Sequence, residues 1–171
     1  MKSEENKQKY EDISEIGFPE TEAGHEEEND QQDVKQSEDD FDYQSLIAMN
    51  SDCVGWIQIP GTDINYPVVQ AADNEFYLTH NFNRETAACG AIFMDFRNDV
   101  DAKAEHLILY GHQMKDNSMF KQLNGYKEEI FYKEHPNIKL YLHEQKYEYE
   151  ITAVYVTDVA NGGGYYNYLH W

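Results

Sequence analysis

The chain has 171 residues, which is enough for one domain of ordinary size and little more. Its 33 acidic and 13 basic residues give a formal net charge of −20 at pH 7, so nucleic acids and anionic membrane surfaces are poor candidate partners. Residues 1–42 hold 16 Asp and Glu against 4 Lys, whereas residues 43–171 hold 17 acids against 9 bases. The density of negative charge therefore divides the chain into two parts.

The first part, residues 1–42, carries few apolar side chains, and they follow no helical or strand period. Such a segment buries too little apolar surface to offset the entropy lost on ordering. We therefore expect a disordered acidic arm, which is either a solvated leader or a spacer or docking tail. No apolar run follows Met1, and the longest purely apolar runs span about four residues, so we expect a soluble chain without signal peptide or membrane segment.

From residue 43 onward the chain consists of short apolar or alternating runs separated by turn signals, which is typical of β structure. The expected elements, in chain order, are a helix over 45–51, strands over 54–59 and 64–70, one or two helical turns over 73–80, strands over 91–96 and 107–110, a helix over 119–134 broken at Gly125, and strands over 137–142 and 147–157. This order predicts a mainly β fold with peripheral helices, arranged as an unfinished barrel.

Two segments carry specific expectations. Pro60 and Gly61 occupy the central positions of a type II turn, so the strands on either side are expected to form a hairpin-like pair. The run Leu107–Tyr110 is apolar at every position, which is typical of a strand buried on both faces. The sequence therefore predicts that this run lies centrally in the sheet.

The strongest candidate for chemistry is His112, which follows that apolar run and Gly111. A strand fixes the backbone of the histidine, and the glycine allows another group to approach closely. Both are requirements of a positioned proton-transfer group. A histidine with a purely structural hydrogen bond is the alternative, and these residues alone leave it open.

Metal binding is not indicated. His106 and His112 lie six positions apart on either side of a strand, with no third ligand, so we expect neither a metal nor a cofactor. Cys53 and Cys89 lie outside any Cys-x-x-Cys spacing, and each is expected to be a small buried apolar residue. A disulfide between them, and a reactive thiolate in a Cys-His hydrolase, stay open as alternatives.

Several motifs, in the right order, resemble the class B sortases. The segments that carry the resemblance are Asn50–Thr62, Ile64–Gln70, Asp73–Leu78, Gly90–Asp95, Tyr110–His112 and Met114–Phe120. They stay in register with the family from about residue 43 to residue 171. The match implies that residues 43–171 form a partial class B sortase catalytic domain, with an incomplete sortase-type β-barrel that lacks its last two strands.

The resemblance also implies a reaction. In sortases a Cys attacks the Thr carbonyl of a sorting motif to give a thioester, a His moves protons to and from the amines, and an Arg steadies the substrate and the oxyanion. His112 matches the catalytic His, while Asn74 and Leu78 match residues that line the groove for the sorting motif. The implied partners are sorting-motif peptides of surface proteins and an amine acceptor on peptidoglycan or a pilin.

The sequence also departs from the family. The Thr-x-x-Thr-Cys strand and the Arg that follows it are missing, Cys53 and Cys89 do not occupy the nucleophile position, and the N-terminal membrane anchor of these Gram-positive, extracellular enzymes has no counterpart. We therefore expect the 171 residues to be catalytically silent. The alternatives are a non-enzymatic module that binds sorting peptides and a decayed pseudoenzyme.

Overall fold

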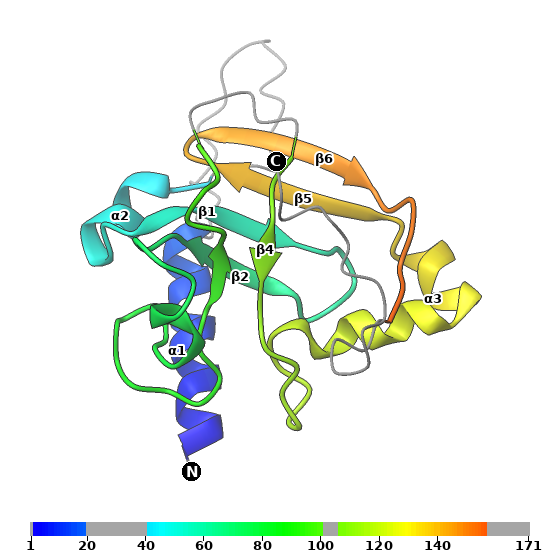
Figure 1. Cartoon of the computed structure of the whole chain (residues 1–171), viewed down its shortest axis with the longest axis horizontal. Helices are drawn as coiled ribbons and strands as arrows, with labels where there is room; N and C mark the ends of the chain where they lie inside the picture. Colours follow the sequence, from blue (N-terminus) through cyan, green and yellow to red (C-terminus); the bar gives the residue numbers. More distant parts are fainter. Residues whose placement is uncertain (1, 20–40, 101–105, 157–171) are drawn as a thin grey trace, which may run out of the picture.

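The computed structural model describes residues 2–19, 41–100 and 106–156 (Figure 1). Six strands form one curled sheet in the order β4-β3-β2-β1-β5-β6, with helices at its periphery. The elements are α1 (Lys2–Gly17), α2 (Tyr43–Met49), β1 (Cys53–Gln58), β2 (Asn65–Val69), the 3₁₀ helix η1 (Phe76–Leu78), β3 (Ile92–Met94), β4 (Leu109–Tyr110), the 3₁₀ helix η2 (Phe120–Lys127), α3 (Glu129–Glu134), β5 (Asn137–Leu142) and β6 (Gln145–Glu150). The predicted class, mainly β with peripheral helices, is confirmed.

The centre of the sheet is the hairpin of β1 and β2. The two strands pair antiparallel, and the turn between them closes with a hydrogen bond of 3.1 Å from the Thr62 amide to the Ile59 carbonyl. β5 pairs with the other edge of β1. α1 contacts β2 and α2 contacts β1, and the side chains of the two strands are largely buried, with Trp56 and Val68 fully covered. The hairpin predicted from Pro60 and Gly61 is confirmed.

β3 joins the sheet parallel to β2, and β4 pairs antiparallel with β3. The prediction that the strand over Leu107–Tyr110 is buried on both faces and lies centrally is wrong for the described sheet. β4 contains two residues, both half-buried, and stands at the end of the strand order. The run is apolar throughout, but β3 is its one strand neighbour among the described residues, so one of its edges is unpaired there.

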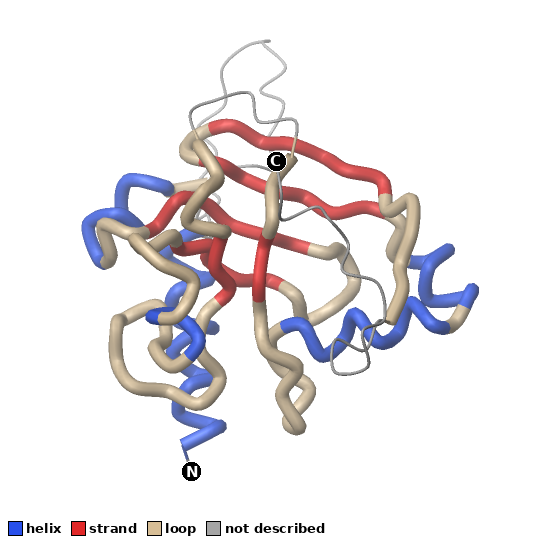
Figure 2. The backbone as a smooth tube through the Cα atoms, in the orientation of Figure 1, coloured by secondary structure: helices blue, strands red, loops and turns tan. Residues whose placement is uncertain are grey.

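The other end of the sheet is the hairpin of β5 and β6, which pair in unbroken register from Asn137↔Glu150 to Leu142↔Gln145 (Figure 2). This hairpin is confirmed, although β6 ends at Glu150, well before residue 157. The helix predicted over 119–134 is present as η2 followed by α3, and it breaks at Glu128, whose backbone is extended, rather than at Gly125.

The N-terminal segment differs from the prediction of disorder, which is wrong for residues 2–17. α1 packs against the sheet through Tyr10 and Ile13, which are 7% and 3% exposed. The Tyr10 ring meets the edge of Tyr66, and its hydroxyl donates a hydrogen bond of 3.0 Å to the Gly90 carbonyl. Residues at this i, i+3 spacing share a helix face, and docking that face stabilises a helix of low intrinsic hydrophobicity.

The remaining part of the predicted arm, residues 20–40, lies outside the described residues, as does the aromatic stretch 165–171. Within the described ranges no helix combines the length and the hydrophobicity needed to cross a bilayer.

Candidate functional site

His112 lies in the loop directly after β4, and both its ring and its backbone are held. Its Nε2 atom is 2.8 Å from the Leu78 carbonyl oxygen, and its own carbonyl accepts a hydrogen bond of 2.9 Å from the Phe120 amide. A carbonyl oxygen can only accept, so Nε2 carries the hydrogen. In the neutral ring Nδ1 is then the atom that can take up a proton, and the half-buried position of His112 leaves room for a reacting group.

The close approach of Leu78 and His112 depends on a glycine that sequence analysis did not single out. Gly90 has φ +59°, and a Cβ atom there would lie 2.4 Å from the Tyr77 carbonyl oxygen and 3.2 Å from the His112 ring. Gly111 is equally enclosed, because a Cβ atom there would lie 2.4 Å from Ile92. The expected close approach beside His112 is thus present, on both sides of the histidine.

Hydrogen bonds and an ion pair hold the short helix η1, which carries the Leu78 carbonyl. The Tyr77 hydroxyl donates a hydrogen bond of 2.7 Å to Asp52 and accepts one of 2.9 Å from the Asn50 side chain. Arg84 forms an ion pair with the same Asp52 carboxylate. Burial raises the pKa of Tyr77, so its hydroxyl keeps the proton that it donates. These bonds hold in place the Leu78 carbonyl, which accepts the hydrogen bond from the His112 ring.

A second buried network lies at the end of β3. The Asp95 side chain, 1% exposed, accepts hydrogen bonds from Arg97, from Asn74 (2.9 Å) and from the Tyr110 hydroxyl (2.8 Å). The bond from Arg97 is the largest cause that holds the pKa of Asp95 well below its usual range. Burial, together with the neighbouring Asp95, raises the pKa of Tyr110 to about 12. Tyr110 is two residues before His112, so the network fixes the strand that carries the histidine.

The structure separates the two predicted groove residues. Leu78 touches His112 through its carbonyl, and the residue is 41% exposed. Asn74 uses both ends of its amide within the protein, since its Nδ2 donates to Asp95 and its Oδ1 accepts from the Phe96 amide at 3.0 Å. Asn74 therefore holds the end of β3. The sequence signal for this network, Asp95 and Arg97 directly after an apolar strand, was overlooked.

The two cysteines are free and buried, and no disulfide joins them. Burial raises the pKa of Cys53 to about 12, and its Sγ atom lies 3.6 Å from the Gly55 carbonyl oxygen. Burial also raises the pKa of Cys89. Reactive cysteines have a lowered pKa and an electropositive setting, so neither thiol resembles an activated nucleophile. Across residues 2–19, 41–100 and 106–156, no three His, Cys, Asp or Glu side chains gather into a group that could hold a metal ion.

A curled six-stranded sheet with a histidine two residues after β4 defines a class of protein, and comparison with known families identifies it. The family model described as "Sortase domain" matches residues 57–167. The chain belongs to the sortase family.

Its relatives place it in class B. Sortase B of Listeria monocytogenes is 44% identical over 112 residues, which are 66% of this chain and 46% of that protein. Sortase B of Staphylococcus aureus is 42% identical over 115 residues, 67% of this chain and 47% of that protein. A crystal structure from Bacillus anthracis, described as similar to sortase B, superposes with a TM-score of 0.74 and 36% identity over 91% of this chain and 69% of that one.

These matches confirm the class B sortase resemblance seen in the motifs. The chain spans about half the length of the curated relatives that it matches.

Proposed function

We propose that this chain provides the histidine-bearing part of a class B sortase, a transpeptidase that cleaves a sorting motif and joins the cleaved protein to an amine. One observation carries the proposal: on the half-barrel of this family, His112 is fixed through Nε2 to the Leu78 carbonyl, which leaves Nδ1 as its proton-transfer atom. The bonds of Tyr77 and of Asp95 hold the segments that carry Leu78 and His112, as a positioned proton-transfer group requires.

The role of His112 follows from the bonds that change. A cysteine thiol gives its proton to His112 Nδ1, and its sulfur bonds to the Thr carbonyl carbon. The peptide C–N bond then breaks, and the proton on Nδ1 goes to the leaving amine. In the second half the incoming amine gives its proton back to Nδ1, its nitrogen bonds to the acyl carbon, and the thiolate leaves. The fixed ring therefore serves as base and as acid without turning.

We also propose that a polypeptide of these 171 residues does not carry out this cycle alone. Its two cysteines, Cys53 and Cys89, are buried with raised pKa values, so neither supplies the thiolate for a thioester. Its two arginines, Arg84 and Arg97, are committed to Asp52 and Asp95. Both observations argue that the family's nucleophile and oxyanion Arg are not among these residues.

The partners that we propose follow from the family. They are the sorting-motif peptide of a surface protein and an amine acceptor on peptidoglycan or a pilin, met at the extracellular face of a Gram-positive cell. Leu78, exposed beside His112, is the proposed contact for the peptide. Asn74 is proposed to act on the peptide groove by holding β3, since its amide is already bonded.

The test uses a fluorogenic peptide that carries a Thr-containing sorting motif. The complete gene product that contains these residues is expected to cleave the peptide. His112→Ala is expected to abolish cleavage, while His135→Ala, at the end of α3, leaves it intact. The 171-residue polypeptide is expected to cleave no faster than its own His112→Ala variant. Cleavage by the complete product that survives His112→Ala contradicts the role of His112.

A thiol assay tests separately whether the 171-residue polypeptide is catalytically inactive. Iodoacetamide is expected to label Cys53 and Cys89 more slowly than an ordinary free thiol, because both are buried with raised pKa values. A hyper-reactive thiol at either position contradicts the proposal and favours a Cys-His hydrolase.

A further inference from the structure

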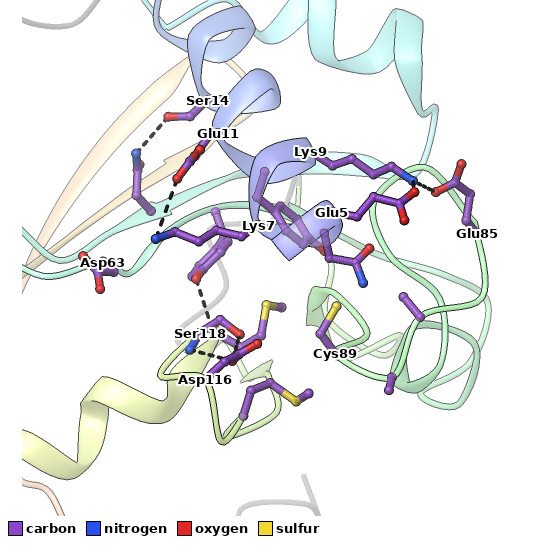
Figure 3. Close-up of a pocket in the computed structure, with 18 of the residues that line it drawn as sticks. Glu5, Lys7, Lys9, Glu11, Ser14, Asp63, Glu85, Cys89, Asp116 and Ser118 are labelled. Carbon is purple, nitrogen blue, oxygen red and sulfur yellow. Dashed lines mark hydrogen bonds and ion pairs between the residues drawn. The ribbon is translucent and has the colours of Figure 1, made fainter. Parts of the chain in front are cut away.

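A cavity of about 1020 Å³ lies between α1 and the sheet, apart from the Leu78–His112 pair, neither of which lines it (Figure 3). Its walls are α1, the beginning of β2 with the turn before it, the segment 85–89 and the loop 114–119. This volume is at the upper end of the range of about 300–1000 Å³ that small-molecule sites occupy. The cavity is therefore large enough for a ligand of several residues.

The floor of the cavity is apolar and preformed. Tyr10, Tyr66, Cys89 and Met119 line it and are each at most 7% exposed. The hydroxyl groups of both tyrosines are already used, since Tyr10 donates to the Gly90 carbonyl and Tyr66 accepts from the Met119 amide at 3.0 Å. The small surface that these four residues leave open to a ligand is therefore mainly carbon and sulfur, which favours an apolar body.

The rim of the cavity is negatively charged. Two lysines of α1, Lys7 and Lys9, face five carboxylates, which belong to Glu5, Glu11, Asp63, Glu85 and Asp116. Both lysines form ion pairs within this set: Lys9 with Glu85 at 2.7 Å and Glu5 at 3.3 Å, and Lys7 with Glu11 at 3.9 Å. The carboxylates outnumber the lysines by three, so the rim attracts cations.

The negative charge of the rim also affects residues of the floor. The pKa of Tyr66 is raised mainly by burial, and Asp63 and Asp116 raise it further; Asp116 also adds to the effect of burial on Cys89. Asp63 belongs to the turn before β2 and Asp116 to the loop 114–119 (Figure 3). An ammonium group placed between them and the floor would therefore meet both negative charge and aromatic rings, which attract cations.

We propose that this cavity binds a short peptide that carries lysine, with its apolar side chains on the tyrosine floor and its ammonium group among the rim carboxylates. The acidic segment of this chain, residues 20–40, is a poor occupant because it contains ten acidic residues and one lysine. The inference concerns binding alone and does not depend on the proposed transpeptidation.

The probe is the acetylated tripeptide amide Leu-Lys-Leu, titrated onto the protein by isothermal calorimetry, with Leu-Glu-Leu as the matched anionic probe and spermidine as a cation without an apolar body. We expect saturable binding of Leu-Lys-Leu, which weakens as ionic strength rises, and no binding of Leu-Glu-Leu. Spermidine is expected to bind at least about tenfold more weakly, because it cannot use the floor.

Two variants locate the site. Asp63→Asn combined with Asp116→Asn keeps the side-chain sizes and the oxygen that accepts from Ser118, and it is expected to weaken binding about fivefold to tenfold. Ala88→Trp, at an exposed position on the wall, is expected to abolish binding by filling the cavity. Glu134→Gln on α3 is the control that removes an acid elsewhere, and it is expected to change nothing.

The proposal is overturned if Leu-Lys-Leu does not bind, if Leu-Glu-Leu binds equally well, or if Ala88→Trp leaves the affinity unchanged. The dependence of Leu-Lys-Leu affinity on ionic strength is measured on the wild type. It therefore tests the role of the rim carboxylates even if a variant fails to fold. Tight binding of spermidine, equal to that of Leu-Lys-Leu, overturns the assignment of a peptide.

Discussion

The two ends of the sheet use polar side chains in opposite ways. At the end of the sheet that holds β3 and β4, the Asp95 carboxylate after β3 and the Tyr77 hydroxyl of η1 are buried and bonded to several partners each. At the other end, every residue of β6 is exposed, and its polar side chains, such as Glu148 and Tyr147, make single bonds beside solvent. Buried polar groups cost free energy when a partner is lost, whereas exposed ones turn to water. The comparison indicates that rigidity is concentrated around His112.

The largest expected difference comes from removing one carboxylate at each end. Asp95→Ala leaves the Asn74 amide and the Tyr110 hydroxyl without their acceptor, so we expect a loss of about 3 kcal/mol in the free energy of unfolding. Glu148→Ala removes one exposed bond to Asn137 and is expected to stay within about 0.5 kcal/mol of the wild type. Urea unfolding measures both, and equal losses would contradict the comparison.

The pH dependence of stability sharpens the same point. The pKa of Asp95 is lowered in the folded protein, mainly by Arg97, while an unfolded Asp titrates near about 3.9. Its stabilisation is therefore complete above that value and is lost as the pH falls through the lower folded pKa. We expect the difference in unfolding free energy between the wild type and Asp95→Asn to be constant from pH 7 to about pH 5 and to shrink below about pH 4. A difference that grows on acidification contradicts the assignment.

A smaller effect is expected at the glycine beside His112. Gly90→Ala forces a Cβ atom against the Tyr77 carbonyl at a positive φ, so we expect a loss of about 2 kcal/mol. The new methyl group also presses on the His112 ring, and the NMR signals of that ring are expected to shift. Ala88→Ser, at an exposed position nearby, is the control. An unchanged His112 spectrum in Gly90→Ala would show that the ring does not depend on this contact.

The smallest expected effect comes from replacing a tyrosine by phenylalanine at each end of the sheet. Tyr77→Phe removes a buried hydroxyl that bonds Asp52 and Asn50, and it is expected to cost about 1 kcal/mol. Tyr147→Phe removes an exposed hydroxyl bonded to Gln145 and is expected to cost less than about 0.5 kcal/mol. Thermal unfolding of the pair checks this, and an equal cost for both would remove the distinction between the two ends.

The same contrast explains what sequence reasoning could find. The hairpin around Pro60 and Gly61, and the pairing of 137–142 with the strand after it, follow from local turn chemistry and alternation, and both are confirmed. α1 was missed because Tyr10 and Ile13 become a helix face only when they dock on Tyr66 and Gly90, which are distant in sequence.

The candidate site shows the same limit. His112 was predicted because an apolar run, a glycine and the family motifs all point to it. Its acceptor, the Leu78 carbonyl, is 34 residues away, and backbone atoms leave no signature in sequence. Asn74 was matched to a groove residue, but its bond to Asp95 depends on the packing of two connections that no periodicity reveals.

The most direct test of the central claim, that His112 is held as a proton-transfer group with Nδ1 free, is the tautomer of its neutral ring. Long-range ¹H–¹⁵N NMR of the ¹⁵N-labelled protein, with His112→Asn to identify the signals, reports which ring nitrogen carries the hydrogen. The account predicts hydrogen on Nε2, bonded to the Leu78 carbonyl, and an unprotonated Nδ1. A neutral ring with its hydrogen on Nδ1 would contradict it.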